Sequence, residues 1–514
     1  MKLNMKKILS AITPRAVVAS LLLILQVILF AVMIRGFTEY LVYFYAVCVV
    51  ISLVVVLYII NKEGDPGYKI AWIVPILLLP LFGGMIYLLL GANGISRGTR
   101  EKMRGMEMGM ITTLEKDNKA GVLAPLGLDA VNQSRYLEKY AHCPLYGNTK
   151  TTYYPLGDDL YEPFLEELRK AKRYIFLEFF IIAPGKFWNA VLDILEDKAA
   201  HGVDVRVIYD DVGCMLTLPG NYFKILEEKG IRCHVFNRVR PVLSVRLNNR
   251  DHRKICVVDG HTAFTGGFNL ADEYINEIRK YGHWKDSGIC LQGEGAWPLT
   301  VMFLTMWEYI TGGKENYETY RPPIQPLEGQ ESGGWVQPYT DSPLDGEPVG
   351  ETVYRNLTAK AKNYIYFTTP YLIISDSLNA ALCSAAKSGV DVRIITPHIP
   401  DKKTVFELTR AHYVPLLQAG VRIYEYTPGF IHAKNCVCDD LYATVGTVNL
   451  DYRSMFLHFE DGVWLCGDPT VLDVKEDMLR TMARSMEVTL KEAQAHRFPR
   501  RLLRSVLRVF APLM

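Results

Sequence analysis

The stretch DHRKICVVDG occupies residues 251–260, and IHAKNCVCDD occupies residues 431–440. Both contain histidine, one residue, lysine, four residues and aspartate, and the two histidines are 180 residues apart. One chance match to this pattern is expected in roughly a few per cent of chains this long. Two matches therefore indicate that each motif belongs to a repeated structure.

The sequence before the two motifs is repeated in the same order. AKRYIFLEFFI (171–181) resembles AKNYIYFTTPYL (361–372), HGVDVRVIYDD (201–211) resembles SGVDVRIITPH (388–398), and EKGIRCHVFN (228–237) resembles QAGVRIYEYT (418–427). In each half, apolar β-branched runs alternate with amphipathic stretches such as FWNAVLDILEDKAAH, which is typical of α/β layers. We therefore predict two duplicated α/β sandwich domains, packed about a pseudo-twofold axis.

Composition along the chain predicts six regions. They are a membrane anchor with two or three hydrophobic helices (1–91), a linker (92–134), a first α/β domain (135–320), a connector (321–345), a second α/β domain (346–495) and a basic amphipathic C-terminal helix (496–514). The length of 514 residues is consistent with several such units.

The anchor contains three apolar runs, Ala16–Ile34, Tyr40–Ile60 and Ile70–Leu90. A transmembrane helix needs about 20 apolar residues, and the first two runs qualify without an internal charge. The third run is also long enough, but its prolines and paired glycines would kink a helix, so it either spans the membrane or forms a bent or re-entrant element. Basic residues before the first run and after the third both favour the cytoplasm. Two full spans and one incomplete span satisfy both groups, which predicts a multi-pass protein with a cytoplasmic catalytic part.

The overall charge is balanced, with 57 basic and 55 acidic residues, so a nucleic-acid partner is not expected. The ten cysteines are scattered, and only Cys436 and Cys438 are close together. Because a zinc site needs about four ligands, this pair alone does not predict one. We expect the thiols to be buried and reduced, which indicates a domain that faces the cytosol, and we expect no metal and no cofactor.

Within each motif, His and Lys are two residues apart and share one face of a strand. If the halves pack together, His252 and Lys254 meet His432 and Lys434 in one cleft. Asp259 and Asp439 complete the two catalytic motifs. They are an odd number of residues from the histidines and lysines, so they point to the other face of the strand. We therefore expect them to support the catalytic side chains from behind.

Further candidate residues occur at equivalent places in both halves. An asparagine follows each motif histidine by seventeen residues, after TGGF and VGTV, and supplies an amide donor: Asn269 and Asn449. HWKDSGI and HFEDGVW contain the carboxylates expected to orient the histidines, Asp286 and Glu460. Asp461, beside Glu460, is expected to be solvated.

Such a set suits a phosphodiester. Two lysines and two asparagines can stabilise the non-bridging oxygens without a metal. One imidazole can attack phosphorus, and the other can protonate the leaving alkoxide. The residues alone do not decide which histidine does which.

The two motif regions, with TGGFNLADEY and VGTVNLDYRSMFLHFED, resemble those of the phospholipase D superfamily, and specifically bacterial cardiolipin synthases. The resemblance extends over nearly all of the chain after about residue 65. It implies a phosphatidyltransferase in the bacterial plasma membrane that converts two phosphatidylglycerols into cardiolipin and glycerol through a phosphohistidine. It also implies that His252 is the nucleophile and His432 the acid and base. No oligomeric state follows from it.

Three other functions were compared with these sequence features. A membrane-bound phospholipase D hydrolase would use the same residues with water as the acceptor. A membrane-bound nuclease is disfavoured by the near-zero net charge. A lipid-binding scaffold without activity is disfavoured because both motifs are intact.

The end of the chain, HRFPRRLLRSVLRVFAPLM, has five arginines interleaved with apolar residues. This pattern predicts an interfacial helix on an anionic membrane, and the alternative is a helix packed on the domain.

Overall fold

The computed structural model describes residues 28, 38–80, 83, 84, 87, 97–114, 119–238, 249–323, 333–495 and 498–513. It divides the chain into two compact units. The smaller unit contains the hydrophobic N-terminal helices, and the larger unit comprises residues 95–238 and 249–508.

In the smaller unit, one helix among the described residues is long and apolar enough to cross a membrane. It is α3 (Thr38–Asn61), whose candidate span Val42–Asn61 matches the second predicted run. The first predicted run lies outside the described residues, apart from Ile28. Several spans are therefore not established by the structure.

The third predicted run is not one straight span. Its helix α4 (Pro66–Leu78) has thirteen residues and would extend only about 20 Å, whereas a bilayer core is about 30 Å thick. Beyond it, the backbone of Gly83 returns so close to Ile76 that an added Cβ would lie 2.4 Å from the Ile76 Cα. The run is thus bent, and Trp72 and Ile76 of α4 pack with Val56 and Ile59 of α3.

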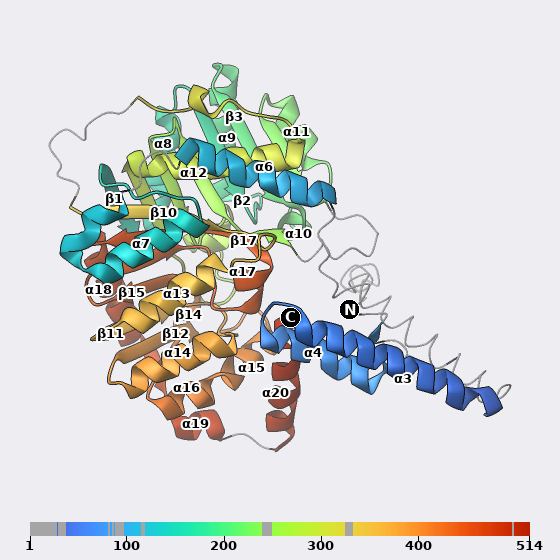
Figure 1. The fold of residues 1–514 in the computed structure, drawn as a ribbon. Coiled ribbons are helices and arrows are strands. Elements are labelled where there is room, and N and C mark those ends of the chain that lie inside the picture. The colour runs from blue at the N-terminus through green and yellow to red at the C-terminus, as the bar shows by residue number, and fades with distance from the viewer. Residues whose placement is uncertain are drawn as a thin grey trace, which may run out of the picture. The chain divides into compact units, whose positions relative to one another are not determined.

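The larger unit contains two mixed sheets, which are covered by helices (Figure 1). The strands of the two sheets follow the same order. The first sheet consists of β1 (Thr149–Tyr154), β9 (Gly288–Gly293), β7 (Thr262–Gly266), β6 (Lys254–Val258), β2 (Tyr174–Phe179), β3 (Asp204–Asp210) and β4 (Arg232–Phe236). The second consists of β10 (Trp335–Asp341), β17 (His458–Cys466), β16 (Tyr442–Gly446), β15 (Asn435–Cys438), β11 (Tyr364–Thr368), β12 (Asp391–Pro397), β13 (Arg422–Tyr426) and β18 (Ser485–Val488). Apart from β18 the two orders correspond strand for strand, which supports the predicted duplication.

Helices join and cover the strands in both halves. The parallel pairs β2–β3 and β11–β12 are connected by α9 (Lys186–Ala200) and α14 (Asp376–Lys387), as parallel strands require a crossover. The other helices of the two halves are α8 (Gly157–Lys170), α10 (Asp211–Cys214), α11 (Tyr222–Glu228), α13 (Val349–Lys360), α15 (Lys403–Ala411), α16 (Tyr413–Ala419), α17 (Tyr452–Phe456), α18 (Thr470–Ala483), α19 (Leu490–Gln494) and α20 (Phe498–Phe510).

One helix between the halves is apolar on every side. All residues of α12 (Trp297–Thr311) from Trp297 to Trp307 are buried, which is expected of a helix without a polar face. It packs against β2, β4 and β6 of the first sheet and against β10 of the second. This shared core holds the two halves together.

The predicted linker and connector are more structured than expected. Residues 92–134 include α6 (Arg97–Leu114), which packs on α12, a 3₁₀ helix (Ala120–Leu126) and the start of α7 (Leu128–Tyr140). The connector 321–345 includes β10, the strand that corresponds to β1. The polar composition of both segments concealed these elements, because their stability comes from tertiary contacts.

Two short strand pairs join the halves reciprocally. β5 (Arg250–Asp251), just before His252, pairs with the start of β17. β14 (Gly429–Ile431), just before His432, pairs with β8 (His283–Lys285). Each pairing brings a motif histidine to the carboxylate region of the opposite half, as halves related by a pseudo-twofold axis require.

Candidate active site

His252 lies between β5 and β6, and its ring is oriented by a residue of the other half. Its Nδ1 lies 3.0 Å from Oε1 and 2.9 Å from Oε2 of Glu460 on β17. Thr447 donates a hydrogen bond to the same carboxyl group. Both His252 and Glu460 are buried. With Nδ1–H directed at Glu460, the second ring nitrogen, Nε2, carries the free lone pair.

His432 has the mirror arrangement. Its Nδ1 lies 2.6 Å from Oδ2 of Asp286, and the backbone amide of Ser287 donates to Oδ1 of Asp286 at 2.9 Å. Each of these two carboxylates, which were candidates from the sequence, thus lies beside the motif histidine of the opposite half. Neither half alone contains an oriented motif histidine.

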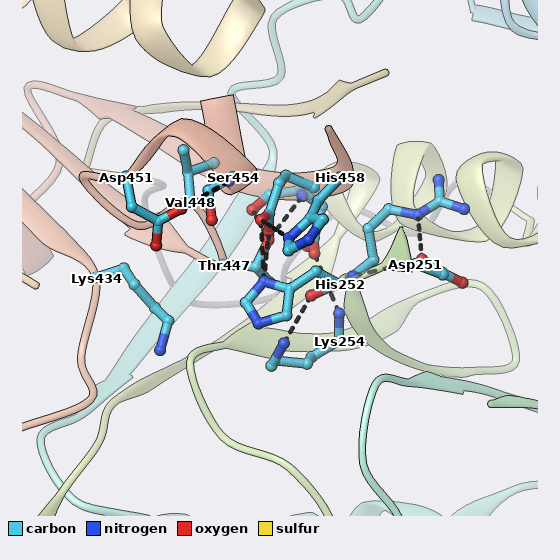
Figure 2. A network of polar contacts seen from close by, with 12 residues as sticks. Asp251, His252, Lys254, Lys434, Thr447, Val448, Asp451, Ser454 and His458 are labelled. Carbon is cyan, nitrogen blue, oxygen red and sulfur yellow. Dashed lines mark hydrogen bonds and ion pairs between the residues drawn. The ribbon is translucent and has the colours of Figure 1, made fainter. Parts of the chain in front are cut away.

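The motif lysines lie beside their own histidines. Lys254 Nζ donates to the carbonyl oxygen of His252 at 2.6 Å, and Lys434 Nζ likewise binds the carbonyl oxygen of His432. Figure 2 shows Lys434 reaching toward His252 from the other half. The four predicted His and Lys side chains therefore belong to one buried cluster, as the sequence predicted.

Burial and mutual repulsion disfavour positive charge in this cluster. Burial lowers the pKa of Lys254 to about 8 and that of Lys434 to about 7. Burial, with Lys434 nearby, lowers the pKa of His432 to about 4, and the pKa of His252 is also well below its usual value. A bound phosphodiester anion would reverse these shifts, because a nearby negative charge favours the protonated forms.

The two carboxylates have different electrostatic environments. Although burial acts in the opposite direction, Lys434 and His432 lower the pKa of Asp286, which is therefore ionised. Burial raises the pKa of Glu460 well above its usual value. The Asp286 side of the site is thus better suited to stabilise a protonated imidazole.

Asp259 and Asp439 lie at the far ends of their motif strands and bind backbone. Asp259 accepts hydrogen bonds from the amides of residues 172–174 at 2.7–2.9 Å. Asp439 accepts equivalent bonds from residues 362–364 at 2.6–2.9 Å. Both have a left-handed backbone, with φ of 52° and 53°. These contacts fix the start of β2 and β11, so we attribute a structural role to both residues instead of a contact with substrate.

Asp259→Ala and Asp439→Ala should therefore lower stability and leave the chemistry intact. Each loses a charged acceptor for three amides, which costs about 1.5–3 kcal/mol. We expect the apparent melting temperature in detergent to fall by several degrees, while the rate per folded molecule stays within about twofold. Asp193→Ala, which removes an exposed carboxylate of α9, is the control. A rate loss without a change in melting temperature would instead indicate a catalytic role.

The predicted asparagines are both buried, and both side chains have partners in the protein; that of Asn449 is Asp451. Asn269 Oδ1 accepts from the amide of Ile181, and Nδ2 donates to the hydroxyl of Tyr274 at 2.7 Å. The Tyr274 ring lies 5.5 Å from that of His432. Asn449 Oδ1 has no hydrogen-bond partner among the described residues.

The sequence did not indicate three buried residues that lie beside the site. Asp461, expected to be solvated, is fully buried; it accepts bonds from the amide of Lys254 and from Thr265, and burial raises its pKa to about 6. His458 is buried beside His252, and Trp284 packs at 5.6 Å from His432. His458 shares strand parity with Glu460, and that parity was a usable signal.

No group of four potential zinc ligands forms around the cysteine pair in the described part of the chain. All ten cysteines are described; none is in a disulfide, and nine are buried.

Comparisons with known proteins agree with this geometry. A family model described as "Cardiolipin synthase, PLD-like domain" matches residues 164–280 and 354–482, and one described as "Phospholipase_D-nuclease N-terminal" matches residues 49–91. The chain is 31% identical to cardiolipin synthase 2 of Bacillus anthracis over 88% of each chain. It is 32% identical to cardiolipin synthase of Geobacillus kaustophilus over 91% of this chain and 92% of the relative.

A further relative is an uncharacterised protein of Streptococcus mutans, with 41% identity over 89% of this chain and 99% of the relative. Among solved structures, phosphatidylserine synthase of Haemophilus influenzae aligns with a TM-score of 0.56 at 15% identity, covering 74% of this chain and 97% of that one. This structural likeness shows a shared fold.

Proposed function

Because this chain belongs to the bacterial cardiolipin synthases of the phospholipase D superfamily, we propose that it transfers a phosphatidyl group between two phosphatidylglycerols, forming cardiolipin and releasing glycerol. It is a phosphatidyltransferase, and its substrates place it at a membrane. The observation that carries the proposal is the pair of buried histidines, each oriented by a carboxylate of the other half and accompanied by a lysine.

The reaction begins with attack on phosphorus. Nε2 of His252 forms a bond to the phosphorus of the first lipid, and the bond from phosphorus to the glycerol oxygen breaks. His432 gives its proton to that oxygen, so glycerol leaves neutral. Lys254 and Lys434 stabilise the negative charge that develops on the non-bridging oxygens.

The second step reverses the roles. His432, now neutral, removes the proton from a headgroup hydroxyl of the second phosphatidylglycerol, and this oxygen attacks phosphorus as the bond to Nε2 of His252 breaks. The ionised Asp286 beside His432 supports His432 as the residue that carries the proton. The neutral form favoured at His252 supports it as the nucleophile. One phosphodiester replaces another, so no cofactor is needed.

The direct test uses purified full-length protein in detergent with phosphatidylglycerol, without nucleotide or added metal, and lipid products are measured by mass spectrometry. Cardiolipin and glycerol in equal amounts are expected. Phosphatidic acid as the main product would identify a hydrolase, and no turnover would contradict both activities on this lipid.

Lipid binding should weaken as the pH rises through the lysine pKa values. Below about pH 7 both lysines are charged and attract the phosphodiester; above their pKa values of about 7 and 8 the neutral forms do not. We expect KM for phosphatidylglycerol to rise at least about tenfold between about pH 6 and pH 9. Lys434→Arg, which stays charged over this range, should flatten the rise. An unchanged rise in that variant would exclude Lys434 as its cause.

We further propose that α20 lies on the membrane surface through its apolar side. Two of its arginines are engaged by the protein, because Arg500 and Arg504 bind Glu407 of α15. On the opposite side, apolar residues are about half exposed or more, and they are Phe498, Leu502, Leu503 and Val506. Such an exposed apolar strip on a lipid-modifying enzyme is suited to insertion into the interface.

Replacing Leu502 and Leu503 by serine should therefore impair action on bilayers. Losing the burial of two leucines in lipid costs about 2 kcal/mol. We expect activity on phosphatidylglycerol vesicles to fall about 30-fold, while activity on short-chain lipid below its micelle concentration stays the same. Leu472→Ser, which alters an equally exposed leucine of α18, is the matched control. Equal losses on both substrates would show that α20 acts on folding or on the site instead.

A further inference from the structure

His458 is a buried histidine to which the proposed reaction gives no role. It begins β17, and neither of its ring nitrogens has a hydrogen-bond partner among the described residues. Its ring lies 5.5 Å from that of His252, and its Nδ1 lies 3.6 Å from Oε1 of Glu460 (Figure 2). An unsatisfied buried imidazole typically costs about 1–3 kcal/mol, so its presence needs an explanation.

Packing alone does not explain the histidine. Gly266 pairs with Gly288 in the first sheet, and Gly446 pairs with Gly462 in the second. Counting four residues back from Gly288 and from Gly462 gives Trp284 and His458 as equivalent positions. Trp284 forms the aromatic wall beside His432, as His458 does beside His252. An indole nitrogen is a donor only, whereas an imidazole also offers a lone pair, so the second half has a ligand where the first has none.

That lone pair belongs to a compact set of donors. His252, His458 and Glu460 each offer one ligand atom, and these atoms lie within 4.8 Å of one another. They form the one such group found among the described residues. Two imidazoles and a carboxylate are a common ligand set for Zn²⁺, whose tetrahedral ligands lie about 3.4 Å apart. The distances of 2.9 Å and 3.6 Å from Glu460 to the two imidazoles are near that spacing.

We propose that His252, His458 and Glu460 form an inhibitory binding site for Zn²⁺ or a similar divalent transition-metal ion. The inhibitory effect rests on the proposed function. A metal ion bound to Nδ1 of His252 requires the other neutral tautomer of the ring, in which the single ring proton has moved from Nδ1 to Nε2. That nitrogen then has no lone pair with which to attack phosphorus. Mg²⁺ and Ca²⁺ prefer oxygen ligands and should not act at this site.

The test uses tag-free full-length protein in detergent, freed of metal by a chelator. Co²⁺ is added without lipid, and the visible d–d absorption that reports a bound ion of low coordination number is recorded. Zn²⁺ should abolish this signal by displacement. In the lipid assay, micromolar Zn²⁺ should inhibit cardiolipin formation, and Mg²⁺ should not.

The decisive variant is His458→Phe, which keeps an aromatic wall and removes the ligand. We expect it to lose the Co²⁺ absorption and to need at least about 100-fold more Zn²⁺ for half inhibition, with an uninhibited rate within about twofold of wild type. His458→Trp, which copies Trp284, is a second variant in case the first folds poorly. His398→Phe removes another histidine that lies beside a carboxylate, Glu425, and should change nothing.

The outcomes separate the two proposals. Co²⁺ absorption or Zn²⁺ inhibition that is the same in wild type and both His458 variants would overturn the metal site, as would thiolate-to-cobalt absorption in the near ultraviolet, which would point to the cysteines. A His458-dependent Co²⁺ signal in a protein that makes no cardiolipin would support the site and contradict the proposed function. Cardiolipin synthesis without any cobalt signal would contradict the site alone.

Discussion

Replacing His252 by alanine is expected to lower the rate of cardiolipin formation by about 10⁵-fold or more, and replacing His432 by alanine to lower it by about 10²–10⁴-fold. The first variant loses the atom that forms the covalent bond to phosphorus. The second retains that atom and loses proton transfer to the leaving glycerol, whose usual contribution is of that size. Rates are measured with phosphatidylglycerol in mixed micelles.

A substrate that needs no acid separates the two roles. In a phosphatidyl ester of p-nitrophenol, the leaving group departs without a proton. His432→Ala should therefore release one equivalent of nitrophenol and retain the phosphatidyl group on the peptide that contains His252, because no base activates the acceptor. His252→Ala should release none. An adduct on His432 in the His252 variant would reverse the assignment.

The control for loss of a buried histidine is His412→Ala. His412 is buried, and its Nδ1 bonds to the carbonyl of Leu408 within its own half. It should keep nearly the wild-type rate even where it lowers the melting temperature. A comparable rate loss in this variant would mean that the effects at His252 and His432 arise from folding.

The repeated motif was sufficient to predict the duplicated α/β fold and the residue types of the site. His252, Lys254, His432 and Lys434 could be found because strand parity and spacing are local properties. The same parity argument directed Asp259 and Asp439 away from the cleft, and their contacts with backbone amides agree with it. Equivalent positions in two copies also made Asp286 and Glu460 visible.

Properties that depend on packing between the halves were not predictable. Nothing local tells that Glu460 serves His252 and Asp286 serves His432, because this follows from the strand pairs β5–β17 and β8–β14. Asp461 was expected to be solvated because it adds a second acidic residue beside Glu460, yet it accepts hydrogen bonds from Thr265 and the Lys254 amide of the other half. Likewise α6 and β10 lie in segments of polar composition, and their partners α12 and β17 are far away in sequence.

Each motif histidine is oriented by a carboxylate of the opposite half, and replacing these carboxylates should have the second large effect on the rate. Glu460→Gln and Asp286→Asn should each lower the rate by about 10³-fold or more, because an amide in place of the carboxylate loses its charge and can select the wrong tautomer of its histidine. At Asp286, Oδ1 accepts from the Ser287 amide, so in the variant the NH₂ group is directed at Nδ1 of His432. The proton then moves to Nε2, and His432 cannot act as a base.

The reaction of each variant with the p-nitrophenyl ester identifies which histidine each carboxylate orients. Glu460 contacts Nδ1 of His252 at 2.9 Å, so Glu460→Gln should behave like His252→Ala and form little phosphatidyl-enzyme. Asp286→Asn should behave like His432→Ala and accumulate it. Asp341→Asn is the matched control, since Asp341 is buried and accepts from a backbone amide, that of Gly350. If each carboxylate served the histidine of its own half, the two patterns would be exchanged. The predicted pattern would instead mean that each motif histidine depends on a carboxylate of the opposite half, so one copy of the motif in this arrangement is inactive without the other.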